Sequence, residues 1–574
     1  MKLSRIFRTF LFIVFSTWQT TIGTVSVLMV ALLFTMAVHV VPDGAYRDRD
    51  CVAPPVDPRK AVVHVDHQLG DEWDCRGEQF VLEAGQEFTL NFLEFSEDGT
   101  PAGATLADGT SAQLATFQRL LEPDEKTYVL VFAHGWRNNA SYGNHDIHKF
   151  RILLAYAAAF VNQRCHADGD TTYCGMKVRG LALGYRGASF NERDEHGNAL
   201  PDLQASLMAA PTFMARKALT DGDLARGAAG TLPMAVAAAL RDIESGLALR
   251  DHTGLGPDRM IVVGHSLGAN LLLRAFKADI VQAVSRHQTG SILPAVIGDL
   301  LVLVNPATTA AVWMEIAQSV RTATGVPETG RFTSTSASFF GDGQPPVVMA
   351  LTATCPFYAS IFEGWREYWE TYFRQFHAAL AEKLNPACDW VTAFALPLAE
   401  AMGSDNNGSQ YSTIALGQLV PHEPDGLAGL THGLETNTST GTRTSFARSG
   451  QEEFNRCTEV PGWLLAARGR VAGQHEPWDA GHRRDGPQAN LSPVRLASGE
   501  WKRLEIQFSL VADIYWGEPH SIDARWIASP NDPFWNVAAH ANTIEHHGGY
   551  VSYQLWCALN QFVLDDTTDR YASH

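Results

Sequence analysis

The chain has 574 residues, 45% of them hydrophobic, and a formal net charge of −18. This hydrophobic content excludes a disordered chain and is sufficient for a large core with accessory segments. The acidic balance, with no basic run, argues against nucleic-acid binding.

The first expected element is an apolar segment close to the N-terminus. No charged residue occurs between positions 9 and 42, and the most apolar part is 22–41. About 20 apolar residues span a bilayer, whereas a cleaved signal peptide has a shorter apolar region and a small-residue cleavage site. We therefore expect residues 1–45 to form a cytoplasmic N-terminus and a transmembrane signal-anchor, with a cleaved signal as the less favoured alternative. The body of the chain would then lie outside the cytoplasm.

Eight cysteines agree with that location, because disulfides persist in oxidising compartments. Cys165 and Cys174 flank a short polar loop, and Cys355 and Cys388 bracket one aromatic segment. The connectivity cannot be derived from the sequence, and buried free thiols remain the alternative. No Cys or His spacing is typical of zinc, and nothing in the sequence indicates a cofactor.

The body of the chain alternates between two kinds of apolar pattern. Residues 46–75, which include the proline-rich CVAPPVDPRK, are expected to form a linker. Strands are expected within 88–99, 127–136, 176–187, 258–266, 298–308, 345–355 and 501–516, and helices within 145–163, 230–247, 267–284 and 552–564. This alternation predicts an α/β domain over 76–574, with a doubly wound, mostly parallel sheet covered on both faces.

Three segments do not fit the alternation and are expected to be insertions, at about 186–230, 356–387 and 422–488. The first is long and polar, and the third is expected to form long loops. The second has aromatic residues at alternating spacings of four and three, at Tyr358, Phe362, Trp365, Trp369, Tyr372 and Phe376. This spacing predicts an aromatic stripe along a helix. Such a stripe packs on the core, or forms a lid or membrane-facing wall that admits acyl chains.

The sequence GHSLG at 264–268 fits the pattern G-x-S-x-G, with a strand expected before it and a helix after it. A nucleophile elbow needs a tight strand-to-helix turn that holds the serine in a strained conformation. Gly264 and Gly268 would relieve crowding around Ser266, and the helix N-terminus favours developing negative charge. The pattern predicts that Ser266 is a nucleophile, and a structural turn serine is the alternative.

The run VFAHGWRNN supports this prediction, because it places His134, Gly135 and Trp136 after an expected strand. The backbone N–H groups of Trp136 and Leu267 are the expected donors of an oxyanion hole. Gly135 would let the backbone approach closely. His134 is expected to orient this loop and not to take part in catalysis.

With HGW at 134–136, GHSLG at 264–268 and the segments described next, the chain resembles the serine esterase and lipase branch of the α/β-hydrolase superfamily. The resemblance is to membrane-anchored bacterial members and covers roughly 76–574. It implies an α/β-hydrolase fold with insertions, and a triad in the chain order serine, acid, histidine.

The resemblance points to Asp389 as the acid. The segment DWVTAFALP, which begins at Asp389, looks like the one that follows the acid-bearing strand in the superfamily. No carboxylate directly follows the strand expected at 345–355, so the insertion 356–387 would intervene, closed at its base by a Cys355–Cys388 disulfide. A helix cap is the alternative role for Asp389, and Asp299 and Asp342 are the alternative acids.

The expected base lies before the helix at 552–564, where His540, His546 and His547 occur. The form I-x-x-H before an apolar helix resembles the histidine segment of the superfamily, and Ile544 puts His547 in that place. His546 is the alternative base. A metal site made of the three histidines is disfavoured, because no carboxylate pattern converges on them.

The resemblance implies that His547 takes the proton of Ser266 as it attacks a carbonyl, while Asp389 holds the imidazole. We therefore expect a membrane-anchored serine hydrolase acting on carboxylic esters, with lipid or acyl esters as a candidate class. An amidase or peptidase with the same triad, and a non-catalytic binding protein with this fold, are the alternatives. The expected partners are a small-molecule or lipid ester and the membrane, and no protein partner is indicated.

Overall fold

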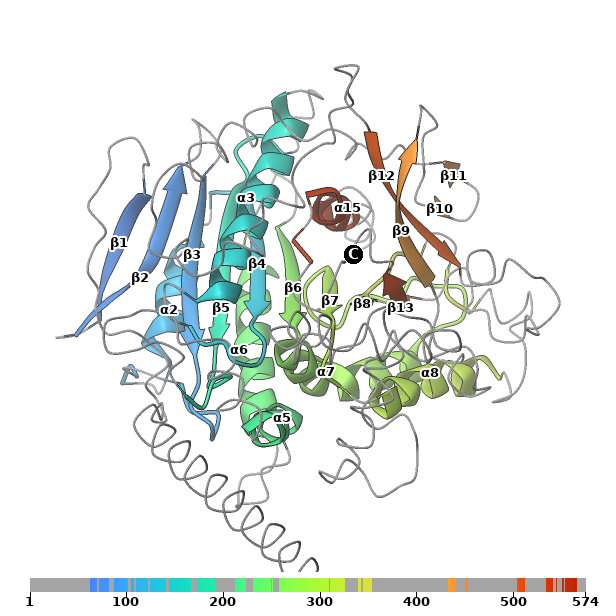
Figure 1. The fold of residues 1–574 in the computed structure, drawn as a ribbon, viewed down its shortest axis with the longest axis horizontal. Coiled ribbons are helices and arrows are strands. Elements are labelled where there is room, and N and C mark those ends of the chain that lie inside the picture. The colour runs from blue at the N-terminus through green and yellow to red at the C-terminus, as the bar shows by residue number, and fades with distance from the viewer. Residues whose placement is uncertain are drawn as a thin grey trace, which may run out of the picture.

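A mostly parallel β-sheet forms the centre of the protein in this computed structural model (Figure 1). The strand order is β1-β2-β3-β5-β4-β6-β7-β8-β13-β9-β12. Neighbouring strands are parallel from β3 to β9, and β1, β2 and β12 are antiparallel to their neighbours. The bounds are β1 Val62–Leu69, β2 Glu72–Val81, β3 Glu87–Glu94, β4 Thr127–Ala133, β5 Lys177–Gly184, β6 Arg259–His265, β7 Leu300–Val304, β8 Val348–Ala353, β9 His432–Ser439, β12 Arg503–Leu510 and β13 Phe534–Ala539. A separate hairpin joins β10 Ala447–Arg448 to β11 Gln451–Glu452.

The structure describes residues 62–69, 72–81, 87–101, 105–107, 110–121, 124–140, 144–166, 173–190, 212–222, 231–248, 250, 258–308, 310–325, 339–341, 344–353, 432–439, 447–448, 451–452, 503–510, 533–539, 544, 550–551 and 553–564. The predicted membrane helix at 22–41, the aromatic insertion at 356–387 and the Cys355–Cys388 disulfide lie outside these ranges. Among the helices that the structure does describe, none is long and apolar enough to cross a bilayer.

Helices cover both faces of the sheet, as the alternation of elements predicts. On one face lie α3 (His145–His166) and α15 (Tyr553–Leu564). On the other lie α2 (Ala112–Arg119), α6 (Thr231–Ala248), α7 (Leu267–Arg286) and α8 (Ala310–Thr324). The predicted α/β architecture is therefore confirmed.

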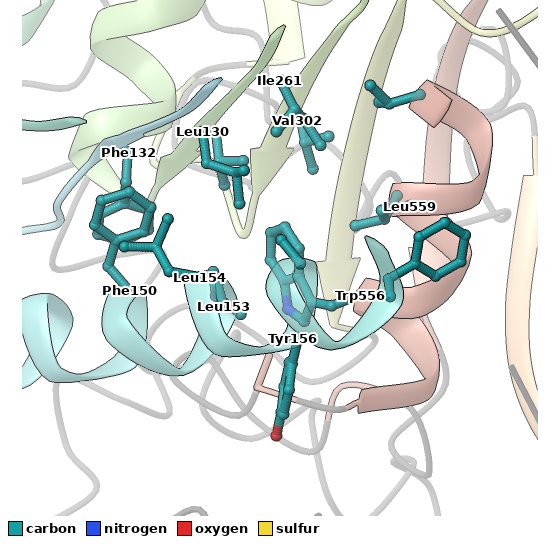
Figure 2. Close-up of a cluster of buried hydrophobic side chains, with 14 of the residues drawn as sticks. Leu130, Phe132, Phe150, Leu153, Leu154, Tyr156, Ile261, Val302, Trp556 and Leu559 are labelled. Carbon is teal, nitrogen blue, oxygen red and sulfur yellow. The ribbon is translucent and has the colours of Figure 1, made fainter. Parts of the chain in front are cut away.

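The sequence of β4, TYVLVFA, explains why this strand lies in the middle of the fold. All of its residues are buried. Tyr128, Leu130 and Phe132 pack towards α3 and α15, whereas the alternate residues pack towards α6 and α7. Figure 2 shows the first of these clusters, where Phe150 of α3 and Trp556 of α15 meet the strands. Fully burying one such side chain contributes about 1.5–3 kcal/mol, so the strand is held firmly from both sides.

Three parts of the sheet differ from the sequence-based expectation. β1 and the start of β2 fall within 46–75, which the sequence assigns to a linker. β9 to β11 fall within 422–488, which the sequence assigns to loops. β13 is not anticipated at all. Strands at a sheet margin are held by backbone hydrogen bonds to a neighbouring strand, so polar segments such as HGLETNTS of β9 can form them without an apolar pattern.

Cys165 at the end of α3 forms a disulfide with Cys174, across a sequence separation of 9. Replacing both cysteines by serine is expected to lower the free energy of unfolding by about 2–3 kcal/mol, because a closed loop of this length restricts the unfolded chain. Urea unfolding of the double variant and the wild type, both without reductant, measures the difference. Equal unfolding midpoints would show that the disulfide does not stabilise the fold.

Candidate functional site

The carboxyl ends of three neighbouring strands, β4, β6 and β7, meet at one edge of the sheet. Among the described residues, the non-glycine residues with positive φ are Arg137 (64°), Ser266 (57°) and Asn305 (44°). Each of them lies in the loop or turn that follows one of these three strands. Strained backbone of this kind clusters at functional sites, so this edge is the candidate site.

Ser266 occupies the turn between β6 and α7, with φ 57° and ψ −118°. Its N–H donates to the Val304 carbonyl at 2.9 Å, and its own carbonyl accepts from Asn270 N–H at 3.1 Å and Ala307 N–H at 3.0 Å. A serine that begins a helix usually accepts a hydrogen bond from the first turn, but Ser266 makes no such side-chain cap. The strained conformation expected of an elbow is present, and the hydroxyl is not used for capping.

Two glycines permit the close packing around this turn. A Cβ atom on Gly135 would lie 2.9 Å from the Ser266 Cβ and 3.0 Å from His265 Nδ1. A Cβ atom on Gly268 would lie 2.2 Å from the Ala133 carbonyl oxygen and 2.4 Å from the His134 carbonyl oxygen. The HGW loop after β4 therefore lies directly against the serine and the first turn of α7.

Most peptide groups of the HGW loop have a hydrogen-bond partner, and the Trp136 N–H differs from them. The His134 carbonyl accepts from Tyr185 Oη at 2.5 Å, and the Gly135 N–H donates to Asp146 Oδ2 at 2.8 Å. The Trp136 carbonyl accepts from Asn138 Nδ2 at 3.0 Å, and the Arg137 N–H donates to the Gly187 carbonyl at 3.1 Å. Within the described residues, the Trp136 N–H has no acceptor.

The orientation of that N–H is set by His134. His134 Nδ1 lies 3.0 Å from the Gly135 carbonyl, and its Nε2 lies 3.3 Å from the Tyr185 N–H. A carbonyl and an N–H partner fix the neutral tautomer that carries its proton on Nδ1, and burial lowers the pKa of His134. The Gly135 carbonyl and the Trp136 N–H point in opposite directions from one planar peptide, so holding the first directs the second. The expected orienting role of His134 is consistent with this geometry.

The second expected donor is the N–H of Leu267, the first residue of α7. The first N–H groups of a helix have no partner within the helix, and they favour negative charge. No described residue accepts from Leu267 N–H. The two amides expected to bind an oxyanion thus belong to segments in contact with Ser266, and both are free of acceptors in the described part of the chain.

A buried carboxylate that the sequence did not single out completes this edge. Asp146, in the first turn of α3, accepts hydrogen bonds on Oδ2 from Gly135 N–H at 2.8 Å, Asn138 Nδ2 at 3.0 Å and His265 Nδ1 at 2.9 Å. It is 2% exposed. An acidic residue is common in the first turn of a helix, where it interacts with the helix dipole, so its position alone gave no signal.

The C-terminal part of the chain reaches the same cluster through Tyr550. The rings of Tyr550 and His265 lie 4.6 Å apart between centroids, and Trp556 Nε1 donates to the Tyr550 carbonyl at 2.8 Å. Burial, and then the charge of Asp146, raise the pKa of the Tyr550 hydroxyl well above its ordinary value. Ile544 is fully buried in the core cluster on the same face. Both described residues that flank 545–549 are therefore anchored in the core.

A small apolar cluster lies beside the serine. Leu267 and Ala307 form a small cluster against which Trp136 and Phe213 pack, and the Trp136 and Phe213 rings meet edge-on at 5.1 Å. Phe213 begins α5 (Phe213–Asp221), within the segment expected to be an insertion at 186–230. Asn270 Nδ2 donates to Thr220 Oγ1 and to Asp221 Oδ1 at 2.9 Å each, which ties α5 to α7.

The structure brings together Ser266, Trp136 and Leu267, whereas Asp389, His546, His547 and Asp342 lie outside the described residues. Asp299 lies at the opposite edge of the sheet, because its Oδ2 accepts from Met260 N–H at 2.7 Å at the start of β6. Asp299 is therefore not positioned to act with Ser266. In the part of the chain that the structure describes, no group of three or more His, Cys, Asp and Glu residues could hold a metal ion.

No family model, no curated protein and no solved structure matches this chain.

Proposed function

We propose that this chain is a serine hydrolase of the α/β-hydrolase type that cleaves carboxylic esters, with Ser266 as its nucleophile. The observation that carries the proposal is Ser266 itself, held at φ 57° between a parallel strand and a helix, with a hydroxyl that caps nothing. Strain in a serine backbone has a cost of about 1–3 kcal/mol, and a mere turn residue has no need of it. The Trp136 N–H, for which the described part of the chain offers no acceptor, supports the same proposal.

The proposed chemistry follows from these groups. The Ser266 Oγ attacks the ester carbonyl carbon as the base takes its proton, and the N–H groups of Trp136 and Leu267 stabilise the oxyanion. The base returns the proton to the alkoxide, which leaves as the alcohol and gives an acyl-enzyme. Water then releases the acid. The partly buried side chains of Trp136 and Phe213, which pack on Leu267 and Ala307, support an ester with an apolar acyl or alkyl group.

His547 is proposed as the general base, with His546 as the alternative. Asp389 is proposed as the carboxylate that holds the imidazole of the base. Tyr550 supports the location of the base, because its ring contacts His265, next to Ser266. Three residues of chain reach at most about 11 Å, so a base at 547 would fall within that distance of Tyr550. The role of Asp389 and the N-terminal membrane anchor remain predictions from the sequence.

A fluorophosphonate probe tests the proposal, because it phosphonylates only an activated serine. We expect labelling of the full-length wild type and of Ser285→Ala, and none of Ser266→Ala. Ser285 is the matched control because it lies in α7, the helix that Ser266 precedes, is exposed, and donates to the Gln282 carbonyl. An unlabelled wild type would reject the nucleophile and favour a binding protein. Comparing the turnover of a p-nitrophenyl ester with that of the p-nitroanilide of the same acyl group then distinguishes esterase from amidase activity.

A further inference from the structure

We propose that Asp146 is a positioning residue that couples the oxyanion loop to the nucleophile strand. This inference rests on the proposed function of Ser266. One carboxylate oxygen accepts from the loop through Gly135 N–H and from β6 through His265 Nδ1. These two donors immediately precede Trp136 and Ser266 in the chain. Asp146 thus connects the residue before the oxyanion donor to the residue before the nucleophile.

Asn138 extends this connection to the Trp136 peptide. Its Nδ2 donates both to Asp146 Oδ2 and to the Trp136 carbonyl, at 3.0 Å each. The loop is therefore held to Asp146 on both sides of the Trp136 N–H. Hydrogen bonds to a charged acceptor are roughly twice as strong as those between neutral groups, so a carboxylate holds this geometry better than an amide would.

The surroundings keep Asp146 itself in place. Asn144 Oδ1 accepts from the Asp146 N–H at 3.0 Å, which fixes the start of α3. The Tyr550 ring covers His265, and Lys149 Nζ lies 5.1 Å from the centre of the same ring. The loop after β4, strand β6 and the segment at Tyr550 thus meet around one buried carboxylate at the start of α3, although Asp146 makes no bond to Ser266 that would make it catalytic.

Removing the Asp146 carboxylate is expected to lower kcat much more than it changes KM. Without the carboxylate, the Trp136 N–H would no longer be held where charge develops, and a shift of about 1 Å can reduce a rate about 100-fold. Asp146→Ala is expected to lower kcat by about 10- to 100-fold, with KM changed less than about threefold. Asp146→Asn keeps an oxygen acceptor and should recover most of the loss. Asn138→Ala removes one tether and should show a smaller change in the same direction.

An alkyl boronic acid separates positioning from general destabilisation. Ser266 Oγ bonds to boron, and the tetrahedral boronate places a charged oxygen in the oxyanion hole. If Asp146 positions the hole, the Ki of the boronic acid should rise in proportion to the fall in kcat/KM across these variants. Fluorophosphonate titration gives the fraction of active protein, by which each rate is corrected.

Asp299→Asn is the matched control, because Asp299 is also a buried carboxylate that accepts a backbone N–H, at the other end of β6. It should lower stability without changing corrected kcat or Ki. If Asp146→Ala keeps wild-type corrected kcat and Ki, Asp146 is structural only and the inference is wrong. If Asp146→Ala does not fold, Asn138→Ala decides by the same measurements, because it removes one tether and leaves the carboxylate. An unlabelled wild type would reject the proposed function, and this inference with it.

Discussion

Ser266→Ala is expected to lower kcat for a p-nitrophenyl ester by about 10⁴- to 10⁶-fold, the range found when a triad serine is removed. The oxyanion donors and the apolar cluster of Trp136, Phe213, Leu267 and Ala307 remain in the variant, so a small residual rate and near-normal substrate binding should persist. Steady-state turnover of the purified full-length protein measures this loss. A rate within tenfold of the wild type would show that another residue carries the reaction.

The same position allows a measurement of strain. Alanine and glycine both remove the hydroxyl, but only glycine tolerates φ 57° with ψ −118° without steric cost. Ser266→Gly should therefore be more stable than Ser266→Ala by about 1–2 kcal/mol, despite the extra freedom that glycine gives the unfolded chain. Chemical denaturation of the inactive pair measures the difference. Equal stability would mean that the turn is not strained.

Gly268→Ala is expected to destabilise the protein by about 3 kcal/mol, the largest effect on stability expected of a single methyl group here. The added Cβ would lie 2.2 Å and 2.4 Å from the carbonyl oxygens of Ala133 and His134, at the end of β4. Both atoms belong to the backbone, so relief requires α7 to move away from the sheet. Such a shift would also displace Leu267 and lower kcat.

Gly246→Ala is the control for this substitution. Gly246 also lies in a helix, α6, but nothing lies within 4 Å of an added Cβ. Alanine is the better helix former, so this variant should gain about 0.5–1 kcal/mol. Urea unfolding of the two variants should therefore give effects of opposite sign. Similar destabilisation of both would contradict the close packing inferred for Gly268.

The elements around Ser266 could be predicted from the sequence because their local signals agree with the fold. The apolar runs of β4 and β6 are buried on both faces, and the GHSLG turn contains the residues that its backbone requires. β13 could not be predicted in the same way. A short apolar run such as FWNVAA does not separate a buried strand from a helix segment, and its partner β8 is distant in sequence.

The contacts that orient the site were also beyond sequence reasoning. Asp146 lies in an ordinary helix start, and only the folded chain shows that His265 and Gly135 converge on it. Likewise, the Trp136 N–H, which has no acceptor among the described residues, becomes distinctive only when the partners of Gly135 N–H and the Trp136 carbonyl are seen. Tertiary hydrogen bonds of this kind leave no periodic pattern in a sequence.

The distance between the two edges of the sheet has a practical consequence for engineering. Stabilising substitutions often reduce activity where they relieve strain that the chemistry requires. Here the positive-φ residues other than glycine, among those described, follow the carboxyl ends of the strands, whereas Asp299 and Met260 join at the amino end. A mutant library confined to the amino end could raise thermal tolerance while leaving the turn that holds Ser266 unaltered. Thermal stability and catalytic activity would then be improved by substitutions at separate edges of the same sheet.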